Sequence, residues 1–188
     1  MDKISIGAKP FLYPMPTVLV GANVSGKPNY MTVGWAGVVN MTPPMISVSI
    51  GHGRYTLKGI HENNAFSVNI PSAVQVVPTD YCGIVSGETV DKSAVFESFY
   101  GQLKTAPMIK DCPMNIECKV NRFIDLGSHE MVLGDVIDVL VDLKCTHNGV
   151  PDMKLIDPLV FAYPQMDYYR LGNQAGKAFS SGKQFKYR

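Results

Sequence analysis

Short runs of branched and aromatic residues, separated by turn residues, recur along most of this chain and limit its fold more than any other feature. Ile46, Val48 and Ile50 alternate with serines, which is the period of a strand with one buried face. The runs predicted to be strands are residues 16–24, 30–40, 45–50, 65–71, 115–125, 130–143 and 159–163. Many antiparallel strands of this length, joined by short turns, favour a barrel over a parallel doubly wound sheet. We therefore predict a mostly β fold, an antiparallel split β-barrel with a few short flanking helices.

Turns and helical stretches complete the expected order of elements. Residues 25–29 and 127–129 are typical of turns and predict two hairpins. Helices are expected at residues 55–63, 76–85 and 92–100. The chain has no internal repeat and no dividing linker, and its 188 residues fit one domain by the usual prior of roughly 100 to 200 residues. Residues 1–188 are therefore predicted to form a single domain.

The composition is that of a globular protein with little net charge. Hydrophobic residues make up 46% of the chain, charged residues 18%, and the formal net charge is +1. Clustered positive charge is what nucleic-acid binding requires, so we expect no nucleic-acid partner. Residues 176–188 are basic and contain Phe179, Phe185 and Tyr187. Docking on a partner subunit explains such a tail at least as well as RNA binding does.

The sequence shows neither a secretion signal nor an apolar run of membrane-spanning length, so we expect a cytoplasmic protein without membrane contact. Cys82, Cys112, Cys118 and Cys145 form no CxxC pair and have no spacing typical of zinc or iron–sulfur sites. No metal site is predicted, and the cysteines are interpreted as buried or half-buried reduced thiols. Cys82 lies in a polar stretch, and we expect it to be the more exposed one.

Several catalytic motifs fail on their spacing. Residues 51–56, GHGRYT, begin a GxGxxG pattern, but Thr56 stands at the third glycine and no βαβ context follows, so a Rossmann site is not expected. His129 is followed by Glu130 as in HExxH, yet Leu133 occupies the position of the second histidine. A GxSxG nucleophile elbow is also missing from the sequence.

The junction between the expected strand ending near Ile50 and the helix starting near Tyr55 has the composition of a phosphate-binding turn. Amides at a helix N-terminus carry partial positive charge, glycine admits a ligand to the backbone, and Arg54 and Thr56 can add hydrogen bonds. An ordinary turn explains the same residues. The junction taken alone leaves both interpretations open.

Several segments together resemble the flavin reductase-like family, and in particular its flavoredoxin group. The similarity follows nearly the whole chain in order, at residues 29–37, 43–50, 54–56, 66–71, 91–92, 128–129, 134–136 and 169–172. The resemblance implies an FMN-binding split barrel, in which strand backbone and small or aromatic side chains hold the flavin ring. Residues 32–35 fit the flavoredoxin group better than the reductases of two-component monooxygenases.

The resemblance also implies a set of site residues. The cofactor-binding residues it implies are Asn29, Met31, Thr32, Val33, Trp35, Ala36, Ser49, Gly51, Arg54, Tyr55, Thr56, Lys92 and His129. Arg54 is expected to pair with the FMN phosphate, and Lys92 with the phosphate or the pyrimidine end of the ring. The resemblance implies His129 as the catalytic residue. It is expected beside the flavin and the nicotinamide, where it orients the bound groups or transfers a proton. A core tryptophan and a solvated lysine are the alternatives for Trp35 and Lys92.

Three functions follow from the resemblance. The first is an FMN oxidoreductase with NADH or NADPH as electron donor, built as a homodimer. The second is an electron carrier that keeps FMN and exchanges electrons with a redox protein partner. The third is a flavin-binding or storage module without a redox task, and the sequence leaves the choice among them open.

Overall fold

The computed structural model describes residues 2–186 of the chain. Its largest element is a seven-stranded sheet whose neighbouring strands are all antiparallel, in the order β3-β2-β6-β9-β10-β5-β4. The strands are β2 (Val18–Val24), β3 (Lys27–Val33), β4 (Ala36–Met41), β5 (Pro44–Gly51), β6 (Ala65–Ile70), β9 (Met114–Asp125) and β10 (His129–Val141). The prediction of a mostly β fold with few helices is confirmed.

This sheet does not close into a barrel. β3 and β4 are its two edges and do not pair with each other in the part of the chain that the structure describes. Only Gly34 and Trp35 separate these two strands in the sequence, so the sheet must curl strongly to bring its opposite edges to one bend. The mostly β part of the prediction holds, whereas the structure shows an open, curled sheet and no closed barrel in residues 2–186, and the strand predicted at residues 30–40 is two strands with a bend between them.

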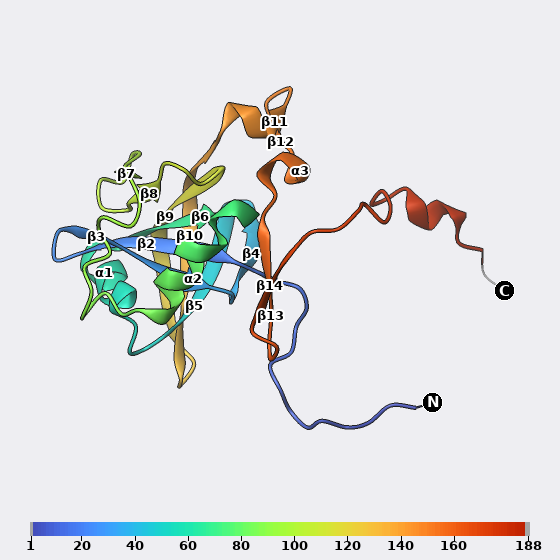
Figure 1. The fold of residues 1–188 in the computed structure, drawn as a ribbon, viewed down its shortest axis with the longest axis horizontal. Coiled ribbons are helices and arrows are strands. Elements are labelled where there is room, and N and C mark those ends of the chain that lie inside the picture. Colours follow the sequence, from blue (N-terminus) through green and yellow to red (C-terminus); the bar gives the residue numbers. More distant parts are fainter. Residues whose placement is uncertain (1, 187–188) are drawn as a thin grey trace.

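Three smaller sheets complete the β structure. β1 (Met15–Pro16), β13 (Leu159–Ala162) and β14 (Asp167–Arg170) form a three-stranded sheet, while β7 (Ser98–Phe99) pairs with β8 (Met108–Ile109) and β11 (Thr146–His147) with β12 (Val150–Pro151). Figure 1 shows β13 and β14 on the side of the molecule from which both chain ends extend. The two predicted hairpins are present as β2–β3 and β9–β10.

The helices are few and short. α1 (Tyr55–Asn63) and α2 (Val76–Ile84) match two predicted helices to within one residue, and α3 (Met153–Ile156) was not predicted. Single 3-10 turns occur at η1 (Ala73–Gln75), η2 (Leu143–Cys145) and η3 (Ser181–Gln184). α1 ends because Asn64 turns to a left-handed conformation, φ 50°, in which its N–H still bonds the carbonyl of Ile60.

The helix predicted at residues 92–100 is absent. These residues form turns and β7 instead. The ring of Phe96 packs edge-on against Tyr30, with 5.5 Å between the ring centroids, and the carbonyl of Glu97 accepts a hydrogen bond from the amide of Lys110. Contacts with distant parts of the chain thus override the local helical preference.

Two apolar cores support the sheet. The larger lies between the seven-stranded sheet and α1, and the smaller contains Leu19, Tyr30, Cys82, Phe96, Ile109 and Cys112. Cys82 is only 1% exposed, so the prediction that it is the more exposed cysteine is wrong. It shares the buried face of α2 with Thr79, three residues away, whereas its neighbour Tyr81 is exposed. All four cysteines are free and buried, which confirms their interpretation as reduced thiols.

The two chain ends project from the body as extended segments (Figure 1). In the C-terminal tail Phe179 is fully exposed, and the predicted tail residues Tyr187 and Arg188 lie outside the described residues. Apolar side chains on the edge strand β4, among them Val38 and Met41, are also exposed. Across residues 2–186, every helix is too short or too polar to cross a membrane.

Candidate functional site

The loop between β5 and α1 presents an uncapped helix N-terminus. Arg54 is the N-cap residue of α1, and its amide bonds the carbonyl of Gly51 at 3.0 Å. Its side chain makes no capping hydrogen bond, and the first turn of the helix contains no acidic residue. The partial positive charge of the first-turn amides is therefore left available to an anion.

Lys92 adds a buried cation to this helix end. Lys92 is only 3% exposed. Its ammonium donates hydrogen bonds to the carbonyls of Cys82 at 3.2 Å and Val85 at 3.1 Å, at the end of α2. Burial lowers the pKa of Lys92; the Cys82 thiol opposes this shift and the Arg54 guanidinium adds to it. Among the described residues neither Lys92 nor Arg54 takes part in an ion pair.

A small cavity lies between these groups, and we call it the cradle. It measures about 90 Å³ and is lined by Met31, residues 53–56, Cys82, Gly83, residues 85–87 and Lys92. Buried charges are normally paired, and Lys92 is buried without a carboxylate partner, so the cavity that it shares with the exposed Arg54 fits an anionic ligand group. Five residues of the predicted set meet here: Met31, Arg54, Tyr55, Thr56 and Lys92. A phosphate fits this donor set by charge and by hydrogen bonding.

Two residues of the predicted set bond each other beside the cradle. The Asn29 amide donates to the Thr56 hydroxyl at 2.7 Å, and both residues are buried. This bond ties β3 to the first turn of α1. Asn29 and Thr56 therefore hold the wall of the cradle in place, and the Thr56 hydroxyl keeps its own hydrogen for donation.

A second group of predicted residues forms an aromatic wall at the Gly34–Trp35 bend. The Trp35 and His129 rings lie 4.5 Å apart between centroids, tilted by 39°. Trp35 is held because its carbonyl accepts from the amide of Ser49 at 2.9 Å, and His129 pairs with Gly51 across β10 and β5. Trp35 remains 42% exposed, so its ring offers surface to a ligand.

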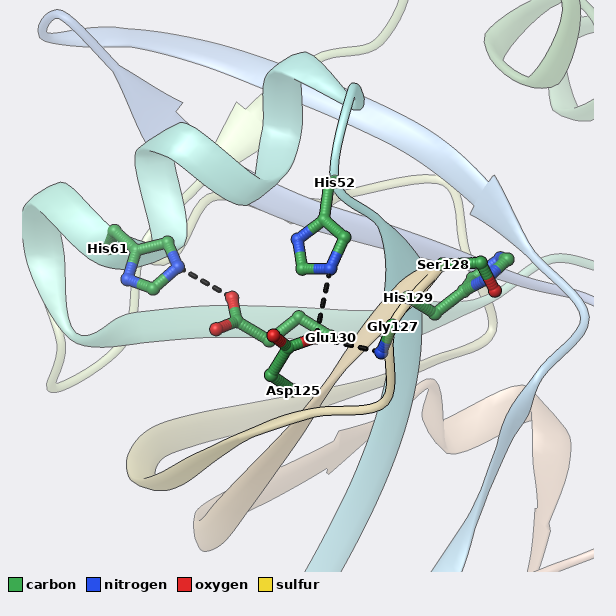
Figure 2. Close-up of polar contacts among 7 residues, drawn as sticks. All are labelled: His52, His61, Asp125, Gly127, Ser128, His129 and Glu130. Carbon is green, nitrogen blue, oxygen red and sulfur yellow. Dashed lines mark hydrogen bonds and ion pairs between the residues drawn. The ribbon is translucent and has the colours of Figure 1, made fainter.

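The end of the β9–β10 hairpin positions His129 (Figure 2). His52 bonds Asp125 at 3.1 Å, and His61 bonds Glu130 at 2.6 Å, which ties the hairpin end to the β5–α1 region. In Figure 2 Ser128 and His129 point away from these two pairs. The Ser128 hydroxyl lies 3.0 Å from Nδ1 of His129 and fixes the orientation of its ring.

Larger spaces adjoin both groups. A cavity of about 340 Å³ shares Arg54 and Gly83 with the cradle and is further lined by Thr17, Thr32, Gly34, Asp80, Ile84, Phe161, Met166 and Tyr168. A groove of about 500 Å³ runs past Trp35, Ala36 and Ser49 toward the N-terminal segment. Val33 lines neither space and belongs to the larger core, so its side chain is structural.

Sequence reasoning did not identify the segment after α2 or the β13–β14 hairpin as parts of the site. Gly83, at the end of α2, and Ser86 and Gly87 in the loop after it line the cradle, although the sequence marked Gly83 only as a helix residue and the other two only as loop residues. Tyr168 donates a hydrogen bond to Asp80 at 3.0 Å beside the larger cavity, where burial and the carboxylate raise the pKa of Tyr168 to about 12. No local sequence pattern indicates that pair.

The curled antiparallel sheet, with the cationic cradle beside it, characterises the class of protein. Residues 11–168 match the family model described as the flavin reductase like domain, and the chain belongs to this family.

Within the family the similarity to flavoredoxins is strong. The chain is 46% identical to the flavoredoxin of Methanosarcina acetivorans, with a TM-score of 0.95 over 97% of this chain and 98% of that one. The flavoredoxin of Desulfovibrio vulgaris (Miyazaki F) is 39% identical, with a TM-score of 0.89 over 96% and 99% of the two chains. An NADH-dependent FAD reductase of Streptomyces globisporus is 25% identical over 65% of this chain and 68% of its own length.

Proposed function

We propose that this protein is an FMN-dependent oxidoreductase that takes electrons from NADH or NADPH and passes them to an acceptor. The observation that carries the proposal is the cradle: two cations without a carboxylate partner and a helix N-terminus surround one small cavity, which opens beside a larger one. Such an arrangement suits a phosphate attached to a larger, partly apolar group. FMN is a group of this kind.

Each part of the site has a separate task in this proposal. Arg54, Lys92 and the first amides of α1 bind the phosphate, and the bend at Gly34–Trp35 with Ala36 and Ser49 lies against the flavin ring. Bound FMN supplies the redox chemistry, since it accepts hydride from a nicotinamide and releases electrons onward. The protein supplies position and a surface that excludes water.

His129 is proposed to contact the nicotinamide donor. Its ring lies against Trp35 and is oriented by Ser128, so it can hold the donor and a proton at a fixed place. The name of the Streptomyces globisporus relative, an NADH-dependent FAD reductase, supports a nicotinamide donor.

A second candidate is an electron carrier that keeps FMN and exchanges electrons only with redox proteins. The sequence identity of 46% and 39% to two flavoredoxins supports this second candidate. The two candidates differ in whether NAD(P)H reduces the bound flavin directly.

Anaerobic reduction tests the proposal. The purified protein, loaded with FMN, is mixed with NADH or NADPH, and bleaching of the flavin absorption band is followed. Fast bleaching is expected for the reductase. Bleaching only with a reduced protein donor would favour the carrier, and a protein that binds no added flavin would refute both.

The Arg54→Ala variant tests the phosphate contact. We expect its FMN affinity to fall by about tenfold or more, because a charge-assisted hydrogen bond contributes about 1.5–3 kcal/mol. Its unfolding free energy should change little, since Arg54 forms no ion pair among the described residues. Unchanged FMN affinity would make the β5–α1 loop an ordinary turn.

We also propose that the protein acts as a homodimer in the cytoplasm. Exposed apolar side chains on the edge strand β4 and on the C-terminal tail, including Val38, Met41 and Phe179, support an interface between copies. Four reduced thiols without a disulfide are typical of a reducing compartment. Sedimentation of the FMN-loaded protein as a monomer would argue against the dimer.

A further inference from the structure

We propose that His61 of α1 is a positioning residue for His129: by its bond to Glu130 it holds the end of the β9–β10 hairpin and so sets the place of the His129 ring. This inference rests on the role of His129 in the proposed function and names the contacts that orient it. It comes from the geometry of the hairpin end and from the alternation of side chains along β10.

The end of the β9–β10 hairpin extends beyond its neighbour in the sheet. β5 ends at Gly51, which pairs with His129, so the turn at residues 126–128 lies past this last pair. The turn is exposed, and the amide of Leu126 bonds the carbonyl of His129 at 2.9 Å, which closes the turn on itself. The place of the turn on the molecule therefore depends on side-chain contacts with α1 and with the loop before it.

The contact with α1 is the stronger one. Nε2 of His61 lies 2.6 Å from the carboxylate of Glu130, whose side chain is only 14% exposed. The His61 ring also stacks on Phe123 of β9, with the centroids 4.0 Å apart and the planes within 16°. A hydrogen bond to a carboxylate is among the stronger ones in proteins, and the stacking fixes the plane of the donor ring. The last turn of α1 thus holds both strands of the hairpin.

A weaker contact supports the same hairpin end. His52, in the loop before α1, lies 3.1 Å from the Asp125 carboxylate, and the same oxygen accepts a hydrogen bond from the amide of Gly127 at 2.8 Å. Both side chains of this pair are exposed, so water weakens their attraction. His61 and Glu130 are therefore the pair that we expect to determine the position of the hairpin end.

The bond on one face of β10 controls the ring on the other face. His129 and Glu130 follow each other in the strand, and consecutive side chains of a strand point to opposite faces. Glu130 points to His61, whereas His129 points away from this pair and packs against Trp35 at 4.5 Å between ring centroids (Figure 2). A displacement of Glu130 therefore moves His129 relative to Trp35.

The pair acts at a distance from the ligand spaces described above. His61 and Glu130 line neither the cradle, nor the groove past Trp35, nor the cavity of about 340 Å³ beside Tyr168. A ligand in those spaces is therefore not expected to touch them. Their effect on a bound donor must pass through His129, which makes them positioning residues.

The fluorescence of Trp35 tests the positioning without any ligand. Trp35 is the single tryptophan of the chain, and an imidazole ring in contact with an indole quenches its emission. His61→Phe keeps an aromatic ring against Phe123 but removes the bond to Glu130. We expect its Trp35 emission to rise most of the way to that of His129→Ala. Emission in His61→Phe that stayed equal to that of the unsubstituted protein, with a rise in His129→Ala, would overturn the proposal.

Two further variants separate the bond from the loss of a histidine. His61→Gln places an amide nitrogen near the position of Nε2, so it can still donate to Glu130, and its Trp35 emission should stay close to that of the unsubstituted protein. His147 of β11 pairs with Asp152 at 3.2 Å, and β11 lies apart from α1 in Figure 1. His147→Phe breaks a pair of the same kind and should leave the emission unchanged. An equal rise in all three variants would contradict the proposal.

Reduction of bound FMN by NADH or NADPH provides the functional readout. In FMN-loaded His61→Phe we expect kcat/KM for the nicotinamide donor to fall about 10- to 100-fold, because a small displacement of a positioning group has effects of this size. The dissociation constant of FMN should not change. An equal loss of FMN affinity would mean that the substitution damages the whole site, which contradicts a positioning role. If NAD(P)H does not reduce the unsubstituted protein, the proposed function fails, while the Trp35 emission still decides whether His61 positions His129.

Discussion

At the scale of single residues, the candidate site contains side chains that hold the protein together and side chains that face a ligand, and the two kinds lie next to each other. Thr56 and Asn29 are buried and bonded to one another at 2.7 Å, whereas the neighbouring Arg54 has no ion-pair partner among the described residues. The sequence pattern groups all three. Their burial and partners predict different effects of substitution: a loss of stability at Asn29 and Thr56, and a loss of ligand binding at Arg54.

Thr56→Val is expected to act on stability. It removes the acceptor of the Asn29 amide without changing the size of the side chain, and an unsatisfied buried donor costs about 1–3 kcal/mol. Urea unfolding of the protein without flavin measures the loss, and Asn29→Ala completes a double-mutant cycle with an expected coupling of about 1 kcal/mol. If Thr56→Val kept its stability and lost FMN affinity, the hydroxyl would be a phosphate ligand.

At the scale of elements, α1 is placed by a close approach to β2. A Cβ atom at Gly59 would overlap the carbonyl oxygen of Asn23 and lie 2.7 Å from a methyl carbon of Val24. The Asn63 amide bonds the same Asn23 carbonyl at 2.8 Å. This contact fixes where the N-terminus of α1, and with it the cradle, lies on the sheet.

Gly59→Ala should therefore destabilise the protein although alanine is the better helix former. The gain in helix propensity is about 1 kcal/mol, whereas overpacking against a backbone carbonyl costs about 1–3 kcal/mol and displaces the helix. We expect a net loss of up to about 2 kcal/mol in urea unfolding together with weaker FMN binding. Lys58→Ala, an exposed change on the same helix, should stay within about 0.5 kcal/mol. A stabilised Gly59→Ala variant would contradict the close contact.

How far the sequence predicts each element depends on how local its causes are. α1 was predicted because its start after Gly53 and its end at Asn64 are marked by the residues themselves. The segment at residues 92–100 was mistaken for a helix because Phe96 is held by Tyr30, far away in the sequence. Lys92 came from the family resemblance alone, and its burial under the end of α2 has no local signal. The role of Gly87 likewise depends on Asn29 and Tyr55, so only the folded chain reveals it.

At the scale of the whole molecule, the buried thiols determine how stability depends on pH. Burial raises the pKa of Cys82 to about 11 and those of Cys112 and Cys118 to about 12, from an ordinary value of 9.0. Between the two values the unfolded chain loses protons that the folded protein keeps. Stability is therefore fully present below pH 9 and is lost as the pH rises above it. Burial of Tyr30 acts in the same direction above pH 10.

Lys92 has the opposite sign. Its pKa is lowered in the folded protein, so the unfolded chain binds the proton more tightly and this group favours folding as the pH approaches 10.5 from below. The Lys92 ammonium therefore offsets the effect of about one thiol on the pH dependence of the unfolding free energy. The three thiols still outweigh it, and the protein is expected to unfold at alkaline pH.

Chemical denaturation from pH 7 to pH 11, with a reductant present, measures this dependence. Each fully titrating thiol lowers the unfolding free energy by about 1.4 kcal/mol per pH unit, so three thiols together give a slope of about 4 kcal/mol per unit before the offset from Lys92. Cys118→Ala should reduce that thiol slope by about a third, because the slope depends on the number of protons released on unfolding. The loss of packing changes the unfolding free energy at pH 7 but leaves this slope unaffected. An unfolding free energy that stayed constant from pH 8 to pH 10.5 in the unsubstituted protein would mean that the thiols ionise as easily in the folded chain as in the unfolded one.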